Sequence, residues 1–262
     1  MDTRGFSERN EETDKISHLI TIQNIHGAHK AVRGTYMEKN IHTLIVSDIH
    51  IGSEISRAKE LVRVLKYLSP RCLILDGDIF DNENPRRLKK DDWDFLSFLQ
   101  NLVSKGTEVI WIQGNHDGFA RSFFQLIGVH TRREFQFMFE GKKCVVLHGH
   151  QYDRFLIKNK IMSITMNASY RVFQKMDRGK RRTSRFLKKQ YKFWLRLSPR
   201  VMKGAVKHAI ERKAQIVVCG HTHQYMDKTV RGVRYLNTGS WTDSPSSFVV
   251  FGKDGIKIES FR

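Results

Sequence analysis

Five short polar clusters carry the residue types that could do chemistry in this chain of 262 residues. Each cluster contains aspartate, histidine or asparagine, and the last four also contain glycine. They are Ser47-Asp48-Ile49-His50, Gly77-Asp78-Ile79-Phe80-Asp81, Gly114-Asn115-His116-Asp117, His148-Gly149-His150 and Gly220-His221-Thr222-His223. Carboxylate, imidazole and amide oxygen are ligands for divalent ions such as manganese, zinc or iron(II), and glycine lets the backbone turn sharply beside a metal or a phosphate. The clusters therefore indicate a metal site.

The spacing within the clusters favours two ions. Residues two apart in an extended segment point to the same side, so Asp48-x-His50 and His221-x-His223 could each deliver two ligands into one crevice. A two-metal site needs about seven such ligands, with one carboxylate shared by ions about 3.5–4 Å apart. Asp78 follows the apolar run CLIL and is the natural bridge. A single cluster would more often be a polar loop, but five clusters that all follow apolar runs favour one site.

The surrounding sequence predicts the elements that must position these clusters. From His42 onward, short β-rich runs alternate with longer amphipathic runs, as in βαβ units that build a parallel sheet. The predicted elements are strands HTLIVSD, CLILDGD, EVIWIQGN and QIVVCG, helices near 57–68 and 91–104, a hairpin of 135–139 with 143–147, and strand regions at 228–236 and 247–251. Ligands gather beyond the carboxyl ends of strands in such sheets. We predict an α/β fold, a four-layer αββα sandwich of two mixed sheets flanked by helices, with an inserted helical subdomain.

The five clusters resemble the signature of the calcineurin-like metallophosphoesterases, which runs D-x-H, G-D-x-x-D, G-N-H-[DE], H and G-H-x-H. The resemblance covers residues 42 to about 251 and implies the αββα fold and two divalent ions, manganese foremost, with iron or zinc as alternatives. It implies that one ion is held by the counterparts of Asp48, His50, Asp78 and His223, and the other by those of Asp78, Asn115, His148 and His221. The implied activity is the hydrolysis of a phosphoester or phosphoanhydride bond.

The same resemblance implies a catalytic role for His116. In the family this histidine, oriented by the acid that follows it, here Asp117, contacts the phosphoryl group as general acid or as transition-state stabiliser. A side chain that can donate a proton near neutral pH suits that role. Asp81 is a candidate for orienting a metal ligand, and the alternative is an acid at the start of a helix.

Within the superfamily, the chain looks most like the UDP-2,3-diacylglucosamine pyrophosphohydrolases of lipid A synthesis. The shared features are the chain length, an insertion between the His148 cluster and Gly220, and the later run YLNTGSW. The resemblance implies a nucleotide-linked glycolipid as substrate. Two departures are His116, where the best-known branch has arginine, and His150, where an aspartate is common.

The predicted insertion, at about 153–213, is strongly basic. Between Arg154 and Lys213 there are 19 Lys or Arg and two acidic residues, so this segment supplies +17 of the net charge of +19. Aromatic residues interleave with these charges, as in a helix that lies in an anionic membrane interface. The same pattern fits helices that dock on the core with a solvated basic face, and it also fits single-strand nucleic-acid binding. The alternative functions are therefore a nucleic acid phosphodiesterase or a general phosphodiesterase of the same superfamily. A metal-bound scaffold without turnover is disfavoured because His116 and all seven ligands are present.

The chain divides into an N-terminal extension at 1–40, polar and compatible with partial disorder, and a metallophosphoesterase domain at 41–262. No apolar run approaches the roughly 20 residues of a membrane span, and the first residues lack the apolar stretch of a signal peptide. We therefore expect a cytoplasmic protein, with peripheral attachment to the cytoplasmic face of the inner membrane as an extension of the lipid hypothesis. Expected partners are a phosphorylated substrate and an anionic membrane surface, with nucleic acid as the alternative.

Overall fold

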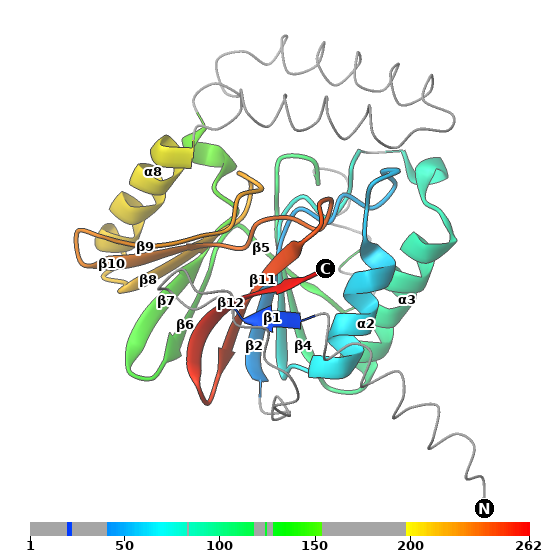
Figure 1. The fold of residues 1–262 in the computed structure, drawn as a ribbon, viewed down its shortest axis with the longest axis horizontal. Coiled ribbons are helices and arrows are strands. Elements are labelled where there is room, and N and C mark those ends of the chain that lie inside the picture. Colours follow the sequence, from blue (N-terminus) through cyan, green and yellow to red (C-terminus); the bar gives the residue numbers. More distant parts are fainter. Residues whose placement is uncertain (1–19, 23–40, 83, 118–123, 125–127, 154–197) are drawn as a thin grey trace, which may run out of the picture.

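The chain forms two β-sheets packed face to face between helices (Figure 1). The computed structural model describes residues 20–22, 41–82, 84–117, 124, 128–153 and 198–262. Most of the N-terminal extension, and residues 154–197 of the predicted insertion, lie outside the described residues.

One sheet has seven strands in the order β1-β12-β11-β2-β3-β4-β5. Strands β2 to β5 run parallel, while β11 pairs antiparallel with both β2 and β12, and β1 pairs antiparallel with β12. The strands are β1 (Ile20–Ile22), β2 (Ile41–Val46), β3 (Cys72–Asp76), β4 (Glu108–Ile112), β5 (His130–Arg132), β11 (Ser246–Gly252) and β12 (Gly255–Phe261). Strand β3 is buried along its whole length, as expected for a central parallel strand covered on both faces.

The second sheet has five strands in the order β6-β7-β8-β10-β9. Its strands are β6 (Phe135–Phe139), β7 (Lys142–Val146), β8 (Ile216–Cys219), β9 (Met226–Val230) and β10 (Val233–Asn237). β7, β8 and β10 are parallel, and the two outer strands pair antiparallel with their neighbours. Both sheets are therefore mixed, and each contains adjacent parallel strands whose carboxyl ends can carry ligands.

Three described α-helices complete the four layers, α2 (Ala58–Leu68), α3 (Lys90–Ser104) and α8 (Ser198–Glu211). Helices α2 and α3 cover the outer face of the seven-stranded sheet, and α8 covers the outer face of the five-stranded sheet (Figure 1). In α2 the buried positions recur every three or four residues, which gives one apolar face. A separate apolar layer between the sheets includes Ile45, Ile74, Val146 and Val218. The predicted αββα sandwich is confirmed.

The predicted strands and helices agree with the observed ones except at the sheet edges. Three strands were not expected, namely β1, β5 and β12. Strand β1 belongs to the predicted N-terminal extension, so at least residues 20–22 of that extension are part of the domain's sheet. Helix α8 is the described part of the basic insertion. None of the helices in the described ranges is long and apolar enough to cross a membrane.

Candidate metal centre

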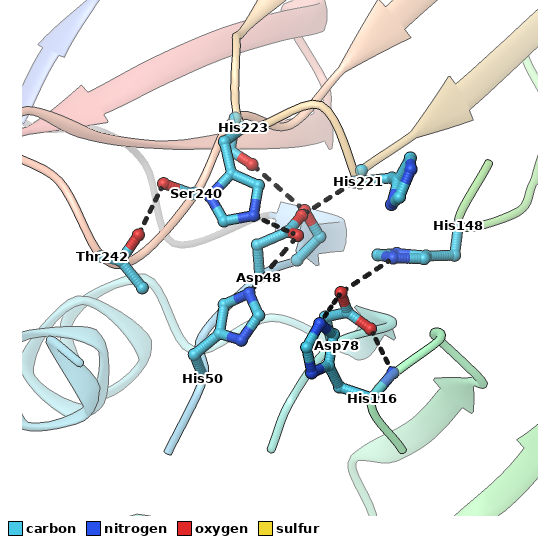
Figure 2. Close-up of polar contacts among 12 residues, drawn as sticks. Asp48, His50, Asp78, His116, His148, His221, His223, Ser240 and Thr242 are labelled. Atoms are coloured by element: carbon cyan, nitrogen blue, oxygen red, sulfur yellow. Dashed lines mark hydrogen bonds and ion pairs between the residues drawn. The ribbon is translucent and has the colours of Figure 1, made fainter. Parts of the chain in front are cut away.

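The candidate ligands meet where the carboxyl ends of parallel strands from both sheets come together (Figure 2). Asp48 and His50 follow β2, and Asp78 follows β3 in the seven-stranded sheet. His148 follows β7, and the His221-x-His223 pair follows β8 in the five-stranded sheet. The site therefore lies at the seam between the sheets, and it needs both of them.

Five of the candidate ligands have left-handed backbone conformations. The φ angles are 53° at Asp48, 51° at His50, 51° at Asp78, 66° at His221 and 56° at His223. This region is sparsely populated by residues that carry a Cβ atom, and such residues concentrate at functional sites. The pairs Asp48-x-His50 and His221-x-His223 are therefore not extended, contrary to the reasoning from sequence, although both members of each pair do reach the same site.

One group of potential ligands consists of Asp48, His50 and His223, whose ligand atoms lie within 4.8 Å of one another. The Nε2 atom of His223 lies 3.0 Å from Oδ1 of Asp48, and the Nε2 atom of His50 lies 3.8 Å from the same oxygen. The rings of His50 and His223 are stacked with centroids 5.2 Å apart. We call these three residues the Asp48 group.

A second group consists of Asp78, His148 and His221, also within 4.8 Å, and we call it the Asp78 group. The Nε2 atom of His148 lies 3.4 Å from Oδ2 of Asp78. The Nδ1 atom of His148 donates to the carbonyl oxygen of Asp76 at 2.7 Å. That bond places a proton on Nδ1 and leaves Nε2 as the nitrogen that faces Asp78. These two groups contain the ligands implied by the sequence except Asn115, but Asp78 belongs to only one of them, so its sharing between two ions stays a prediction.

The electrostatics of the site fit divalent cations. Burial is the largest single influence and favours the neutral form of Asp48, but the interactions with His223, His50 and His148 together outweigh it and hold the pKa of Asp48 well below its ordinary value. At Asp78 burial is likewise the largest single influence, but His148, His116 and His50 together outweigh it and lower the pKa of this carboxyl. Burial lowers the pKa of His148, but Asp78, Asp48 and Asp76 together raise this pKa to about 10. The buried Nε2 atom of His148 has no hydrogen-bond partner in the described structure. Ionised carboxylates and imidazole nitrogens gathered in this way form a donor set suited to manganese, iron or zinc, and a bound cation would take the place of the proton that His148 holds.

His116 lies at the open side of the site with 28% of its side chain exposed. Its backbone N–H donates to Oδ1 of Asp78 at 2.9 Å, and its Nε2 atom lies 3.9 Å from Oδ2 of the same carboxylate. Its Nδ1 atom donates to the carbonyl oxygen of Asp81 at 2.9 Å. The Asp81 carboxylate lies 3.9 Å from Nδ1 of His50 and 2.9 Å from a guanidinium nitrogen of Arg87.

The expected role of Asp117 requires correction, because this residue does not orient the His116 ring. Its carboxylate accepts hydrogen bonds from the backbone N–H groups of Asp78 at 2.7 Å, Gly114 at 2.9 Å and Phe80 at 3.1 Å. Asp117 is fully buried, and burial together with the charge of Asp78 raises its pKa to about 6. It joins the loop after β4 to the loop after β3, so it positions the backbone of Asp78 rather than a catalytic ring.

Asn115 is the one predicted ligand that stands apart. It lies on the bend between Gly114 and His116, and it is exposed. Among the described contacts, none joins its amide to the Asp78 group. Its position next to His116 places it at the rim of the site, and its assignment as a ligand stays a prediction.

The glycines of the clusters permit close approach of the loops. A Cβ atom on Gly114 would lie 2.2 Å from the backbone nitrogen and Oδ1 of Asp78. A Cβ atom on Gly77 would meet the ring of His148 at 2.4 Å. Any side chain at either position would therefore displace a candidate ligand.

Sequence reasoning missed two residues that hold ligands in place. Oδ2 of Asp153 lies 3.1 Å from Nε2 of His221, and both side chains are nearly buried. The Ser47 hydroxyl donates to Oδ2 of Asp48, which also accepts the backbone N–H of His221 at 2.9 Å. Ser47 precedes a ligand directly, and Asp153 is an acid five residues after His148, so position in the sequence was the only available signal.

Comparison with known proteins gives one family match. The profile of the Calcineurin-like phosphoesterase superfamily domain matches residues 41–252. The chain is 24% identical over 230 residues to the DNA polymerase II small subunit of Thermoplasma acidophilum, covering 77% of this chain and 45% of that protein, so the chain spans about half the length of this curated relative.

Solved structures with similar folds were also found. One, described as a novel archaeal phosphodiesterase, matches with a TM-score of 0.47 and 12% identity over 84% of this chain and 99% of its own. Another, Vps29 of Chaetomium thermophilum, matches with a TM-score of 0.48 and 11% identity over 84% of this chain and 90% of its own.

Proposed function

Because this chain belongs to the calcineurin-like phosphoesterase superfamily and is thus a metal-dependent phosphoesterase, we propose that the Asp48 group and the Asp78 group each hold one divalent ion. The observation that carries this proposal is the pair of three-residue groups, each within 4.8 Å, at the seam between the sheets. We infer that the two ions act together on one phosphodiester or diphosphate bond. Bound there, they would lower the pKa of a water molecule and neutralise charge on the phosphoryl oxygens.

Asp78 would be shared between the two ions. Its Oδ2 atom faces His148 and His116, and its Oδ1 atom is held by the backbone N–H of His116. The hydrogen bond from the backbone N–H of Asp78 to the carboxylate of Asp117 fixes the loop from which the Asp78 carboxylate projects. A carboxylate that faces histidines of two different loops, with its backbone anchored, is suited to a bridging role.

His116 would protonate the leaving oxygen. Its Nδ1 atom is engaged with the carbonyl of Asp81, so the proton available for transfer is the one on Nε2 of the imidazolium form. That atom points toward Asp78 from the exposed side of the site, where a substrate can enter. Asn115, on the same rim, would complete the ligands of the Asp78 group.

For the substrate, we propose a nucleotide-linked glycolipid with a diphosphate, similar to UDP-diacylglucosamine. Support comes from the order of the motifs and from the basic insertion, whose described helix α8 exposes Arg200, Lys203 and Lys207. Exposed lysine and arginine can bind an anionic membrane surface peripherally. A second candidate is nucleic acid, which is supported by the similarity to a subunit named for a DNA polymerase.

The first experiment tests the chemistry. We expect the manganese-loaded protein to hydrolyse bis-p-nitrophenyl phosphate, and Asp78→Ala to lose both ions and at least about 1,000-fold in kcat/KM, because two-metal sites depend on the shared carboxylate. Asp254→Ala, which removes an exposed carboxylate on a distant turn, is the control and should behave as the wild type. A fully active Asp78→Ala protein would refute the mechanism.

The second experiment distinguishes the substrates. Release of UMP from UDP-diacylglucosamine, together with binding to vesicles of anionic lipid at low salt, would support the lipid proposal. Manganese-dependent cleavage of single-stranded DNA or RNA, without UMP release, would replace it with the nucleic-acid function. Metal content measured on the purified protein would identify the native ion.

A further inference from the structure

Asp153 makes a buried contact with one histidine of the Asp78 group. Its Oδ2 atom lies 3.1 Å from Nε2 of His221, and the side chains of His221 and Asp153 are only 9% and 2% exposed. A carboxylate accepts a hydrogen bond from an imidazole N–H in such a geometry, which assigns the ring proton of His221 to Nε2 and leaves the lone pair on Nδ1.

The other histidine of this group is held in the same manner. His148 donates from Nδ1 to the carbonyl of Asp76, which leaves Nε2 for the group. Each imidazole of the Asp78 group therefore has one nitrogen engaged by an acceptor outside the group. A fixed tautomer and ring orientation raise metal affinity, since a ligand that is already in place loses less freedom on binding.

The backbone that carries Asp153 is itself braced. The residue ends a short 3-10 helix, η2 (His150–Tyr152), and its N–H donates to the carbonyl of His150 at 3.1 Å. The ring of Tyr152 packs directly on Gly204 of α8, where a Cβ atom would lie 2.4 Å from it. The position of the carboxylate is thus set by helix α8 as well as by the loop after β7.

We propose that Asp153 is a positioning residue that fixes the tautomer of His221 and so sets the affinity of the Asp78 group for its ion, without affecting the Asp48 group. This inference rests on the proposed function only in assuming that the Asp78 group binds a divalent ion. It assigns Asp153 a role in metal loading, and it predicts that the affinities for the two ions can be lowered separately.

The test is a titration of metal-free protein with Mn²⁺, followed by electron paramagnetic resonance of free and bound ion. In Asp153→Leu, which has similar size and no acceptor, we expect one of the two ions to bind roughly 10–100-fold more weakly, and the other to bind as in the wild type. Asp153→Asn keeps an acceptor oxygen and should give an intermediate loss. Histidine ¹⁵N spectra of the metal-free protein should show the Nε2–H tautomer of His221 in the wild type and its loss in Asp153→Leu.

Glu134→Gln is the matched control. Oε2 of Glu134 lies 2.6 Å from Nε2 of His208 between the β5–β6 turn and α8, so this variant weakens a partly buried pair of carboxylate and histidine in the way that Asp153→Asn does. We expect it to lower stability and to leave both Mn²⁺ affinities unchanged.

Two outcomes would overturn the inference. The first is wild-type binding of both ions by Asp153→Leu, and the second is equal weakening of both ions with an unchanged His221 tautomer, which would mean a general structural role. Failure of the proposed function looks different, because the wild type would then bind two ions without hydrolysing any phosphodiester, and the selective effect of Asp153→Leu on binding would still be observed.

Discussion

Left-handed backbone at the ligands predicts an unusual order of stability for glycine and alanine variants. His223 has a φ angle of 56°, and both histidine and alanine carry the Cβ atom that this conformation disfavours. His223→Gly and His223→Ala both remove the imidazole, so in metal-free protein they differ only at the backbone. We expect the glycine variant to be the more stable of the two.

The magnitude follows from two opposing terms. A residue with a Cβ atom in the left-handed region costs about 1–2 kcal/mol. Glycine loses roughly 0.5–1 kcal/mol through the greater freedom of its unfolded chain. The net difference in the free energy of unfolding should favour His223→Gly by roughly 0.5–1 kcal/mol. At Lys203, an exposed position inside α8, alanine should instead be favoured over glycine by about 1 kcal/mol, so the sign reverses between the two sites.

The assay is urea denaturation of all four variants in a buffer with a metal chelator. Equal m-values would show that the folded and unfolded states have not changed in compactness, so that shifts in midpoint report stability. If His223→Ala is at least as stable as His223→Gly, while Lys203 shows the usual helical order, the reasoning on backbone strain is wrong. In a separate measurement without chelator, the wild type should gain stability from Mn²⁺ in proportion to the logarithm of the Mn²⁺ concentration above Kd.

Two further predictions concern a glycine and a buried acid. Gly114→Ala would place a Cβ atom 2.2 Å from the backbone nitrogen of Asp78, so we expect weaker Mn²⁺ binding and lower phosphodiesterase activity. Calorimetry would measure the binding, and turnover of bis-p-nitrophenyl phosphate would measure the activity. Unchanged binding would contradict the tight packing of these loops. Burial raises the pKa of Glu259 from 4.5 to about 7, and no described residue donates a hydrogen bond to its carboxylate. The folded state therefore holds a proton that the unfolded chain releases, and the free energy of unfolding should fall as pH rises from about 4.5 to 7, by up to roughly 3 kcal/mol. Asp117, whose pKa is also raised, contributes a fall of the same sign, so Glu259→Gln should reduce the fall between pH 5 and pH 8 in urea denaturation without abolishing it. A wild-type slope in the variant would exclude Glu259 as a source.

Much of the fold could be predicted because its central elements have local patterns. Strands such as β3 are apolar up to their last residue, here Asp76, since both faces are covered, and α2 and α3 show helical periodicity. Strands β1 and β5 have three residues each, and they exist because they pair at the edges of a sheet already formed. Pairing across more than 200 residues, as between β1 and β12, leaves no trace in the local sequence.

The candidate ligands could be predicted for the same reason, since each one directly follows a strand. Their supporting contacts could not. The carboxylate of Asp117 reaches backbone N–H groups 37 and 39 residues away, and Asp153 meets His221 across 68 residues. A resemblance of motifs can suggest a partner for His116, but only the folded loops show that the carbonyl of Asp81 occupies that position.

The division of the ligands between the sheets has a consequence for folding. The Asp48 group takes His223 from the five-stranded sheet, and the Asp78 group takes His148 and His221 from it, so each ion would connect both sheets. The apolar layer between the sheets lies apart from these loops and buries its residues without any ion. The sandwich should therefore fold when the metal is removed, and the loops at the seam should lose order first, because the strained backbone conformations of the candidate ligands are concentrated there. Hydrogen exchange of the metal-free protein should then show early opening confined to the strand ends, whereas uniform loss of protection would mean that the ions hold the two sheets together.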